Sequence, residues 1–430
     1  MNKALDRHCL SYLPGFFLLP FLTLLTANAA TVSWDGGGGN NSWHTAANWS
    51  GNVLPGPNDD VVIDVAGDIT VVFSSGSTSI RSLQCQEGFQ LTGGTLTVTA
   101  GASVINGALR LAAGSLVVHG PGTTWTANGA TTNETANLTA ETGGRLTLPS
   151  IQRVARTVGG DWILTARGSN SVIDLPNLTQ VSVADFYQFT LQAIDGGHIQ
   201  LPALTQVNAF DAYSDGPGSV VDLSGLPATL RNTTAGSSSL VVIRSGSILI
   251  PNVTALDHID VTLSGNGFIT LAQLTGFTGA TLNLYGATNS LPGLVDAEAA
   301  NFFVDQAASL TLSGVTQLTR FTAGDVRLTA RNGSTLALPN VQSAQTTNFY
   351  QLELTAQSGG RVLLPHLSAL VGGIIVLAEG AGSGVDISNF TGPLINTGPG
   401  AASLEARAGG AILMAKVTRL HRVDLVIRDN

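Results

Sequence analysis

The sequence predicts an all-β protein, a right-handed parallel β-helix (β-solenoid) built from coils of about 20–27 residues. The first observation is a recurring phrase: Leu175-Pro176-Asn177-Leu178-Thr179 returns as Leu201-Pro202-Ala203-Leu204-Thr205. Looser copies follow, and the gaps between their leading apolar residues run from 20 to 27 residues. A period of this length is typical of solenoids, in which each repeat buries its apolar face only by stacking on its neighbours.

The composition is the second observation. The 430 residues are 43% hydrophobic but only 11% charged, and 51 of them are glycine. Many Ser, Thr, Val and Leu residues between glycines favour short strands and tight turns over helices. The net charge is −9, and Lys3 and Lys416 are the only lysines. We therefore expect no nucleic-acid partner and no polybasic membrane anchor, because neither phosphates nor anionic lipids would be neutralised.

Residues 1–29 have the pattern of a signal peptide. Lys3 and Arg7 precede an apolar stretch, and Ala27-Asn28-Ala29 matches a small-x-small cleavage site. The alternative is an uncleaved anchor, although Pro14 and Pro20 interrupt a segment that is short for a membrane span. We expect a secreted or cell-surface protein with no membrane span in the mature chain. Cys85 is then its only cysteine, so stability has to come from packing and from the backbone ladder.

Residues 30–60 are predicted to form a Trp/Gly-rich cap. Trp34, Trp43 and Trp49 lie within sixteen residues of one another, around a run of four glycines. A solenoid needs an atypical terminal unit because its first coil would otherwise expose an apolar face and a strand edge.

The spacing of these tryptophans with Pro55, Asp60 and Ile63 resembles a segment at the start of bacterial exported, autotransporter-like β-helix surface proteins. The likeness is confined to the stretch from Trp34 to Ile63. It implies export and a right-handed β-helix more than it implies a particular chemistry.

Beyond the cap, we expect irregular solenoid coils over residues 61–142 and regular coils over residues 143–430. A longer period overlies the coils: Asp185-Phe186-Tyr187-Gln188 reappears as Asn348-Phe349-Tyr350-Gln351, and Pro176 corresponds to Pro339 at the same offset. This spacing indicates that a block of several coils was duplicated. In the same alignment Asn430 corresponds to Asn266, which lies inside a coil. The pattern therefore predicts a C-terminal continuation or an anchoring domain beyond residue 430.

Alternation predicts which side chains form the core. In the run from Arg145 to Leu148, Leu146 and Leu148 share one face and Thr147 lies on the other. Proline after the strand is expected at a corner, because it would remove an N–H from the ladder. A series of β-sandwiches is the structural alternative. The predicted repeat core comprises Leu148, Leu175, Leu201, Leu338 and Leu364.

Asp174, Asp222 and Asp386 are weak catalytic candidates, because each occupies the same repeat position just before the corner. Asp174 and Asp222 are expected two coils apart, about 10 Å, close to the carboxylate separation of inverting glycosidases. No lysine accompanies them, and solvated outward positions are the alternative explanation.

Asp59, Asp60 and Asp64 are weak calcium candidates near the cap, together with Asn58 and Asp68. A turn capped by aspartate is the alternative, and we expect no cofactor. Phe186-Tyr187 and Phe349-Tyr350 are candidates for carbohydrate contact or for packing at a corner. Asn177, Asn252 and Asn389 begin Asn-x-Ser/Thr sequons that follow from the repeat itself.

Three functions are compatible with this pattern. The low charge and the missing acid–base cluster favour a non-catalytic secreted or cell-surface scaffold, such as an adhesin that binds a glycan or another surface ligand. A polysaccharide lyase or glycoside hydrolase of the β-helix type is the first alternative. A structural spacer is the second.

Overall fold

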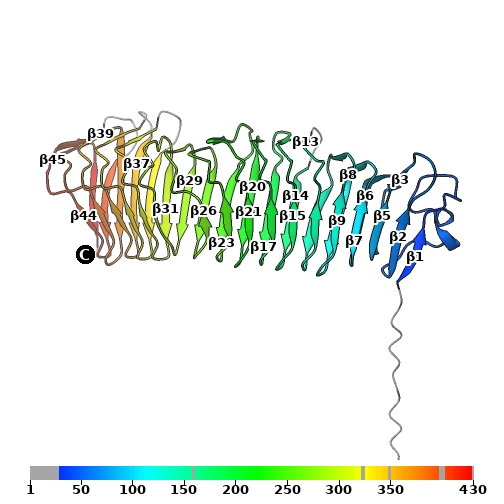
Figure 1. Ribbon diagram of the computed structural model, residues 1–430. Coiled ribbons are helices and arrows are strands. Elements are labelled where there is room, and N and C mark those ends of the chain that lie inside the picture. Colours follow the sequence, from blue (N-terminus) through cyan, green and yellow to red (C-terminus); the bar gives the residue numbers. More distant parts are fainter. Residues whose placement is uncertain (1–28, 157–159, 321–324, 347–349, 397–401, 429–430) are drawn as a thin grey trace, which may run out of the picture.

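The computed structural model describes residues 29–156, 160–320, 325–346, 350–396 and 402–428. The predicted signal peptide lies outside the described residues, apart from Ala29, and so do Phe349 and Asn430. The chain forms an elongated stack of about 16 turns (Figure 1). At the spacing of a parallel ladder, this stack is about 75 Å long. The predicted β-solenoid is confirmed.

The first face of the stack is one long parallel sheet. Its pairing branches where β6 contacts both β3 and β4, and where β8 contacts both β10 and β11. Its strands are β3 (Thr70–Phe73), β4 (Ser77–Ile80), β6 (Gly88–Val98), β8 (Leu109–His119), β10 (Thr131–Asn133), β11 (Asn137–Glu141), β14 (Trp162–Arg167), β17 (Phe189–Ile194), β20 (Phe210–Asp215), β23 (Ser239–Ile243), β26 (Asp260–Ser264), β29 (Thr281–Tyr285), β31 (Asn301–Asp305), β34 (Val326–Arg331), β37 (Gln351–Gln357), β40 (Gly373–Glu379), β43 (Ser403–Arg407) and β46 (Asp424–Arg428).

The second face consists of two sheets that do not pair with each other. The first of them contains β1 (Ala30–Ser33), β2 (Asp59–Ile63), β5 (Ser82–Cys85), β7 (Ala102–Ile105), β9 (Thr124–Ala127), β12 (Arg145–Thr147), β15 (Val172–Asp174), β18 (His198–Gln200), β21 (Val220–Asp222), β24 (Ser247–Leu249) and β27 (Phe268–Ile269). The second contains β30 (Thr288–Ser290), β32 (Ser309–Thr311), β35 (Thr335–Ala337), β38 (Arg361–Leu363), β41 (Gly384–Asp386) and β44 (Ala411–Leu413).

The third face is divided into four short sheets. They contain β13 (Arg153–Arg156), β16 (Gln180–Val183) and β19 (Gln206–Val207); β22 (Thr229–Arg231), β25 (Ala255–Asp257) and β28 (Gly276–Thr278); β33 (Gln317–Thr319), β36 (Ser343–Gln345) and β39 (Ala369–Val371); and β42 (Gly392–Ile395) with β45 (Val417–His421). The described residues include no α-helix, only the short 3₁₀ turns η1 (Ala46–Asn48) and η2 (Ser50–Asn52).

Each coil visits the three faces in turn, as β14, β15 and β16 do. Partners in the first-face ladder can be as near in sequence as Thr70 and Gly88, or as distant as Asp211 and Ser239. Coil length therefore varies more widely than the gaps of 20 to 27 residues between the leading apolar residues predict, because the loops between faces differ in length. The ladder itself is parallel at every pairing of named strands, which excludes antiparallel sandwiches.

Glycine is required at the turn between the first and second faces. Gly196 has φ of +91°, and a Cβ on Gly197 would lie 2.0 Å from the carbonyl oxygen of Ala166 in the preceding coil. Neighbouring coils could not approach to ladder spacing with a larger residue at Gly197.

The predicted core is confirmed. Side chains that alternate along the second face point into the stack, and Leu146 is completely buried. The leading apolar residue of each repeat lies directly after the second-face strand and closes the same interior. The five predicted core residues are 0% exposed: Leu148, Leu175, Leu201, Leu338 and Leu364.

The Leu-Pro-x-Leu phrase is a tight turn at the corner between the second and third faces. Leu175 donates its N–H to the carbonyl of Gln200 in the next coil, and its own carbonyl accepts from Leu178. Pro176 therefore follows the last ladder donor and occupies the second turn position, which its fixed φ favours. The predicted corner position of proline is confirmed.

Polar side chains at this corner connect one coil to the next. Thr205 Oγ1 donates to the carbonyl of Thr179 at 3.1 Å, and Asn177 Nδ2 donates to the carbonyl of Pro149 at 2.8 Å. Asn252 makes the equivalent bond to Ser224. The Asn-x-Thr triplets at Asn177 and Asn252 therefore have a structural role in the ladder.

The longer period of the sequence is visible in the strands. β17 and β37 are seven coils apart along the first face. On the second face, β18 begins at His198 and β38 at Arg361, the same offset that separates Asp185 from Asn348 in the sequence. Block duplication is our interpretation of this spacing.

The three tryptophans of the N-terminal segment form one cluster over the first coils. Trp49 contacts Trp34 and Trp43 edge to face, with ring centroids 5.0 and 4.7 Å apart, and all three are buried. Trp43 also contacts Phe73 on β3, and the Trp49 indole N–H donates to the carbonyl of Trp43 at 2.7 Å. Buried Asn48 fixes the glycine loop by accepting from the N–H of Gly38.

Candidate functional site

The second face is interrupted at one place. β24 pairs with β27 and β30 pairs with β32, but β27 and β30 do not pair. On the first face the ladder continues without a break, because β26 pairs with β29. The two coils therefore separate on the second face alone and leave an open cleft, which we call the seam groove.

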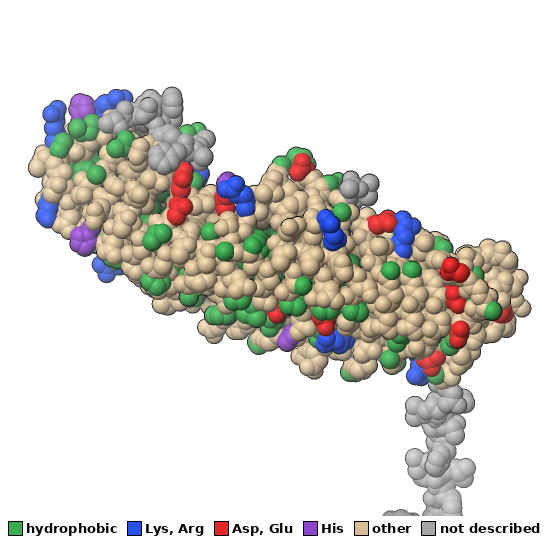
Figure 2. Space-filling view, turned by 45° about the horizontal axis from the view of Figure 1, so that its top comes forward, with side chains coloured by type: hydrophobic (Ala, Val, Ile, Leu, Met, Phe, Trp, Pro, Cys, Tyr) green, Lys and Arg blue, Asp and Glu red, His purple; other side chains and the backbone are tan. Residues whose placement is uncertain are grey.

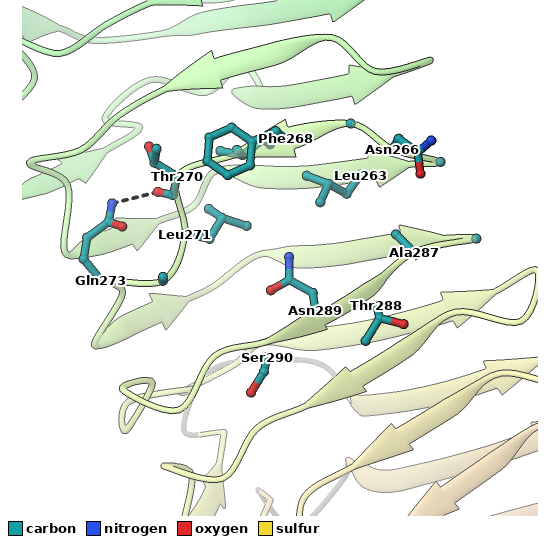
Figure 3. Close-up of a pocket in the computed structure, with 15 residues that line it drawn as sticks. Leu263, Asn266, Phe268, Thr270, Leu271, Gln273, Ala287, Thr288, Asn289 and Ser290 are labelled. Carbon is teal, nitrogen blue, oxygen red and sulfur yellow. Dashed lines mark hydrogen bonds between the residues drawn. The ribbon is translucent and has the colours of Figure 1, made fainter.

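Asn289 lies in the first strand after this separation. In the three-residue strands of the second face other than β30, the central residue points inward and is apolar, as Ile248 is in β24 and Leu310 is in β32, and Ile269 has the equivalent position in β27. Asn289 occupies this position in β30. An amide without partners is costly among leucines, and the half-buried Asn289 instead lines the groove (Figure 3).

The seam groove has a volume of about 650 Å³, and none of its lining side chains is acidic or basic. Phe268 lies at its rim with 52% of its surface exposed. The lining also includes amides and hydroxyls, among them Asn266, Thr288 and Ser290, which lie along the groove and across it from Phe268 in Figure 3.

Gln273 maintains the corner below the groove, where this coil lacks the usual proline. Its Nε2 lies 2.7 Å from the carbonyl of Thr270, and 2.9 Å from the carbonyls of both Ile250 and Val253 (Figure 3). Thr270 Oγ1 accepts from the N–H of Ile250 at 2.7 Å. The groove is therefore built on fixed polar contacts.

A second cavity, of about 690 Å³, lies on the third face and contacts the same irregular coil. It contains a charged cluster, which comprises Arg231, Asp257, His258, Glu298 and Arg320. Elsewhere, charged side chains are scattered singly or in small groups over the surface, as Figure 2 shows for one side of the stack.

Asp257 is the centre of this charged cluster. It is 8% exposed, bonds the Nε of Arg231, and lies 2.5 Å from His258 Nδ1. Burial alone would raise the pKa of Asp257, but hydrogen bonds from His258 and Arg231 outweigh burial and leave that pKa below its ordinary value. Burial also lowers the pKa of Arg320, whose Nη1 donates to the carbonyl of Asp325 at 2.8 Å.

Glu298 is the second carboxylate of the cluster. Asp257 pairs with Thr278, and the bridge between Gly276 and Asp296 places Glu298 opposite Thr278 in the following coil. The two carboxylates are thus two coils apart, about 10 Å. The sequence pattern does not indicate this pair, because the aspartates that recur with the repeat lie on the second face and no repeat position marks Glu298.

The catalytic candidates lie where the sequence predicts them, on second-face strands, but they do not form one site. Gln200 separates Asp174 from Asp222 in the ladder, and Asp386 belongs to the other second-face sheet. Each has a structural partner. Asp174 accepts from Arg145 at 2.5 Å, while Asp222 and Asp386 each accept a backbone N–H two residues later at 2.9 Å.

The calcium candidates are also engaged separately. Asp59 accepts the N–H of Gly56 at 2.8 Å, and Asp60 accepts the hydroxyl of Ser82 at 2.6 Å. Asp64 follows β2 and is exposed. In the part of the chain that the structure describes, no three His, Cys, Asp or Glu side chains lie close enough to hold a metal ion.

Of the aromatic candidates, Phe186 is 76% exposed and Tyr187 is 37% exposed, so Phe186 does not pack at a corner. Tyr350 is half-buried. Phe268 is not one of the aromatic candidates that the sequence predicts. The signal that could have indicated the groove is the polar triplet from Thr288 to Ser290, at a position where other coils have an apolar centre.

The fold defines the class of protein: a parallel β-solenoid of about 16 turns with an N-terminal tryptophan cluster. Comparison with protein-family models, with curated proteins and with solved structures finds no match to this chain. No helix among the described residues is both long and apolar enough to cross a bilayer.

Proposed function

We propose that this protein is a non-catalytic, exported β-solenoid scaffold that binds a cell-surface ligand at the seam groove, as an adhesin does. The regular coils form a rigid support, and the irregular coil presents the binding site. Export follows from the predicted signal peptide. N-terminal sequencing of the secreted chain should give Ala30 as its first residue, and an intact Met1 would contradict export with cleavage.

The neutral lining of the groove carries this proposal. A groove that combines an exposed aromatic ring with amides and hydroxyls suits reversible binding, since the ring supplies apolar area and the polar groups fix orientation. Glycoside hydrolysis requires two carboxyl groups, and the groove lining includes none. Binding without turnover is therefore the activity that this groove supports.

Labelled protein should be applied to arrays of neutral oligosaccharides, acidic oligosaccharides and random peptides. We expect retention on one array, and at least a tenfold loss of retention for Phe268→Ala. Phe186→Ala is the matched control because it removes another exposed ring that is not part of the groove lining. No retention on any array would contradict the proposal and favour the structural spacer. Equal retention of Phe268→Ala and the wild type would contradict binding at the seam groove.

The charged cluster supports a second candidate function, hydrolysis of a polysaccharide. The lowered pKa keeps Asp257 ionised at neutral pH, as the base of an inverting enzyme must be, and Glu298 lies about 10 Å away, close to the separation in such enzymes. Release of reducing ends from polysaccharides should be measured for the wild type, Asp257→Asn and Glu298→Gln. If both substitutions abolish the release of reducing ends and Asp174→Asn leaves it intact, the protein is an enzyme of this class.

A further inference from the structure

We propose that the seam groove binds an extended polypeptide segment of another protein, which adds a strand between β27 and β30. This inference rests on the proposed function because it names the ligand class for the same groove. The recognition is β-augmentation, in which main-chain hydrogen bonds supply affinity and alternate side-chain positions supply specificity.

The two edges of the groove carry free main-chain groups. In the regular coils, alternate residues of a second-face strand bond the preceding and the following coil, as Val172 does with Gly144 and Leu175 with Gln200. By this alternation the outer edge of β27 offers the carbonyl of Gly267, both groups of Ile269 and the N–H of Leu271. None of them has a hydrogen-bond partner among the described residues.

The opposite edge is complementary. The N–H and C=O groups of Thr288 and Ser290 point back toward β27 by the same alternation, and no described residue bonds them. Ala287 and Leu291 instead bond the following coil, as in every regular repeat. Four donors and four acceptors therefore face one gap from two sides, which is the pattern that a single inserted strand satisfies.

The gap between β27 and β30 is wider than the spacing of two paired strands. Most pairs of Cα atoms between β27 and β30 are more than 8 Å apart. Directly paired strands are about 4.8 Å apart, so one intervening strand requires about 9.6 Å. Because the first-face strands β26 and β29 remain paired, the opening is confined to the second face.

Core side chains below the gap are accessible through it. Leu263 is 4% exposed, and Ile269 and Leu271 are each 3% exposed, whereas Leu201 in a closed part of the same face is 0% exposed. The inward residue of an added strand would cover these apolar side chains. The outward residues would lie beside Phe268 and its polar neighbours. The preferred peptide therefore alternates apolar and neutral polar residues.

Asn289 provides the test of this geometry. Asn289→Leu restores an apolar side chain at the inward position, so the two coils should close and the groove should disappear. Labelled wild type, Asn289→Leu and Phe186→Ala are applied to an array of random octapeptides. We expect the wild type and Phe186→Ala to retain alternating peptides, and Asn289→Leu to lose at least tenfold in retention while its thermal midpoint rises.

The best peptide is then synthesised with alternate backbone nitrogens methylated. Methylation removes donors without changing side chains, so strand addition predicts at least a tenfold increase in Kd by fluorescence anisotropy. Equal affinity of the methylated peptide would overturn the inference. So would binding of oligosaccharides but no peptide, an outcome that leaves the proposed function intact. Binding of neither ligand class would remove both proposals.

Discussion

Arg244 donates two hydrogen bonds to Asp215, from Nε to Oδ1 at 2.6 Å and from Nη2 to Oδ2 at 2.7 Å. The two residues are distant in sequence but belong to neighbouring coils. Tyr213 adds a third bond to the same carboxylate at 2.9 Å. The bonds from Arg244 hold the pKa of Asp215 below its ordinary value. An ion pair therefore reinforces the ladder at the turn after β20.

Replacing Asp215 by Asn should reduce stability in a pH-dependent way. Since the folded pKa is below the unfolded pKa, the stabilisation is complete above about pH 4 and is lost as pH falls through the folded pKa. Arg244 is well exposed, so solvent screening limits the loss to about 1 kcal/mol at pH 7. Urea unfolding between pH 7 and pH 2 should show the wild type converging on Asp215→Asn in acid, and a constant difference would contradict this account.

Asp211 on the same strand should behave oppositely. Burial raises the pKa of Asp211, although the Ser239 hydroxyl donates to it at 2.6 Å. A raised folded pKa means that the ionised carboxylate is unfavourable at neutral pH, and that this cost disappears as pH falls through the folded pKa. Asp211→Asn should therefore keep or increase the midpoint of urea unfolding at pH 7. A decrease as large as that of Asp215→Asn would show that the charge of Asp211 is stabilising.

Buried serines at the turns between the first and second faces should be strongly stabilising. Ser219 is 0% exposed, donates to the carbonyl of Asp215 at 2.6 Å and accepts the N–H of Gly196 at 2.9 Å. Ser219→Ala leaves two buried groups unpaired and should cost about 1–3 kcal/mol in hydrogen-exchange protection of β20 and β21. Ser169 lies at the turn before β15 without being fully buried, and Ser169→Ala should change protection little.

Repeat position alone should not determine the cost of a core substitution. Leu201→Ala creates a cavity in a closed coil and should cost about 2–5 kcal/mol. Met414 is the equivalent residue of the last described coil, because the residue before it, Leu413, pairs with Asp386. Met414 is only half-buried, so Met414→Ala should cost about 1 kcal/mol. Hydrogen exchange measured separately on β18 and β44 distinguishes the two, and equal losses would show that the last described coil is closed in solution.

The tryptophan cluster should protect the first coils locally. Trp49→Ala removes both edge-to-face contacts and should cost about 3–5 kcal/mol. Because each coil contacts only its neighbours, exchange should accelerate in β1 and β2 but not in β37. Trp49→Phe retains one aromatic contact and should have a smaller effect. Acceleration along the whole chain would mean that the solenoid unfolds as one unit.

The fold could be predicted because its rules are local. Leu175 and Pro176 mark a corner through their own conformational preferences, and Ile173 two positions earlier shows the alternation that turns a side chain inward. When the same corner residues and the same alternation recur at a regular spacing along the chain, few folds other than a parallel solenoid are compatible with them. The points at which one sheet ends and the next begins on the second and third faces depend, by contrast, on contacts between coils, and no single residue marks them.

The candidate sites could not be predicted in the same way. Asp174 and Asp222 share a repeat position, but each carboxylate already accepts a hydrogen bond. Arg145 donates to Asp174, and the backbone N–H of Ser224 donates to Asp222. Asp257 and Glu298 come together only because a ladder bridge aligns Gly276 with Asp296, and sequence spacing does not reveal such a bridge. The groove arises from a missing pairing, which a search for recurring residues overlooks.

The break between β27 and β30 also has a mechanical consequence. At this level of the described chain the coils are joined by the first-face ladder and by backbone hydrogen bonds on the third face, such as those from Phe277 to Asp296 and from Gly279 to Glu298, but not on the second face. A force that pulls the two ends of the rod apart would concentrate there, so the rod should bend or yield at this level first. A bound strand would bridge the gap, and ligand occupancy would then determine how stiff the rod is under tension.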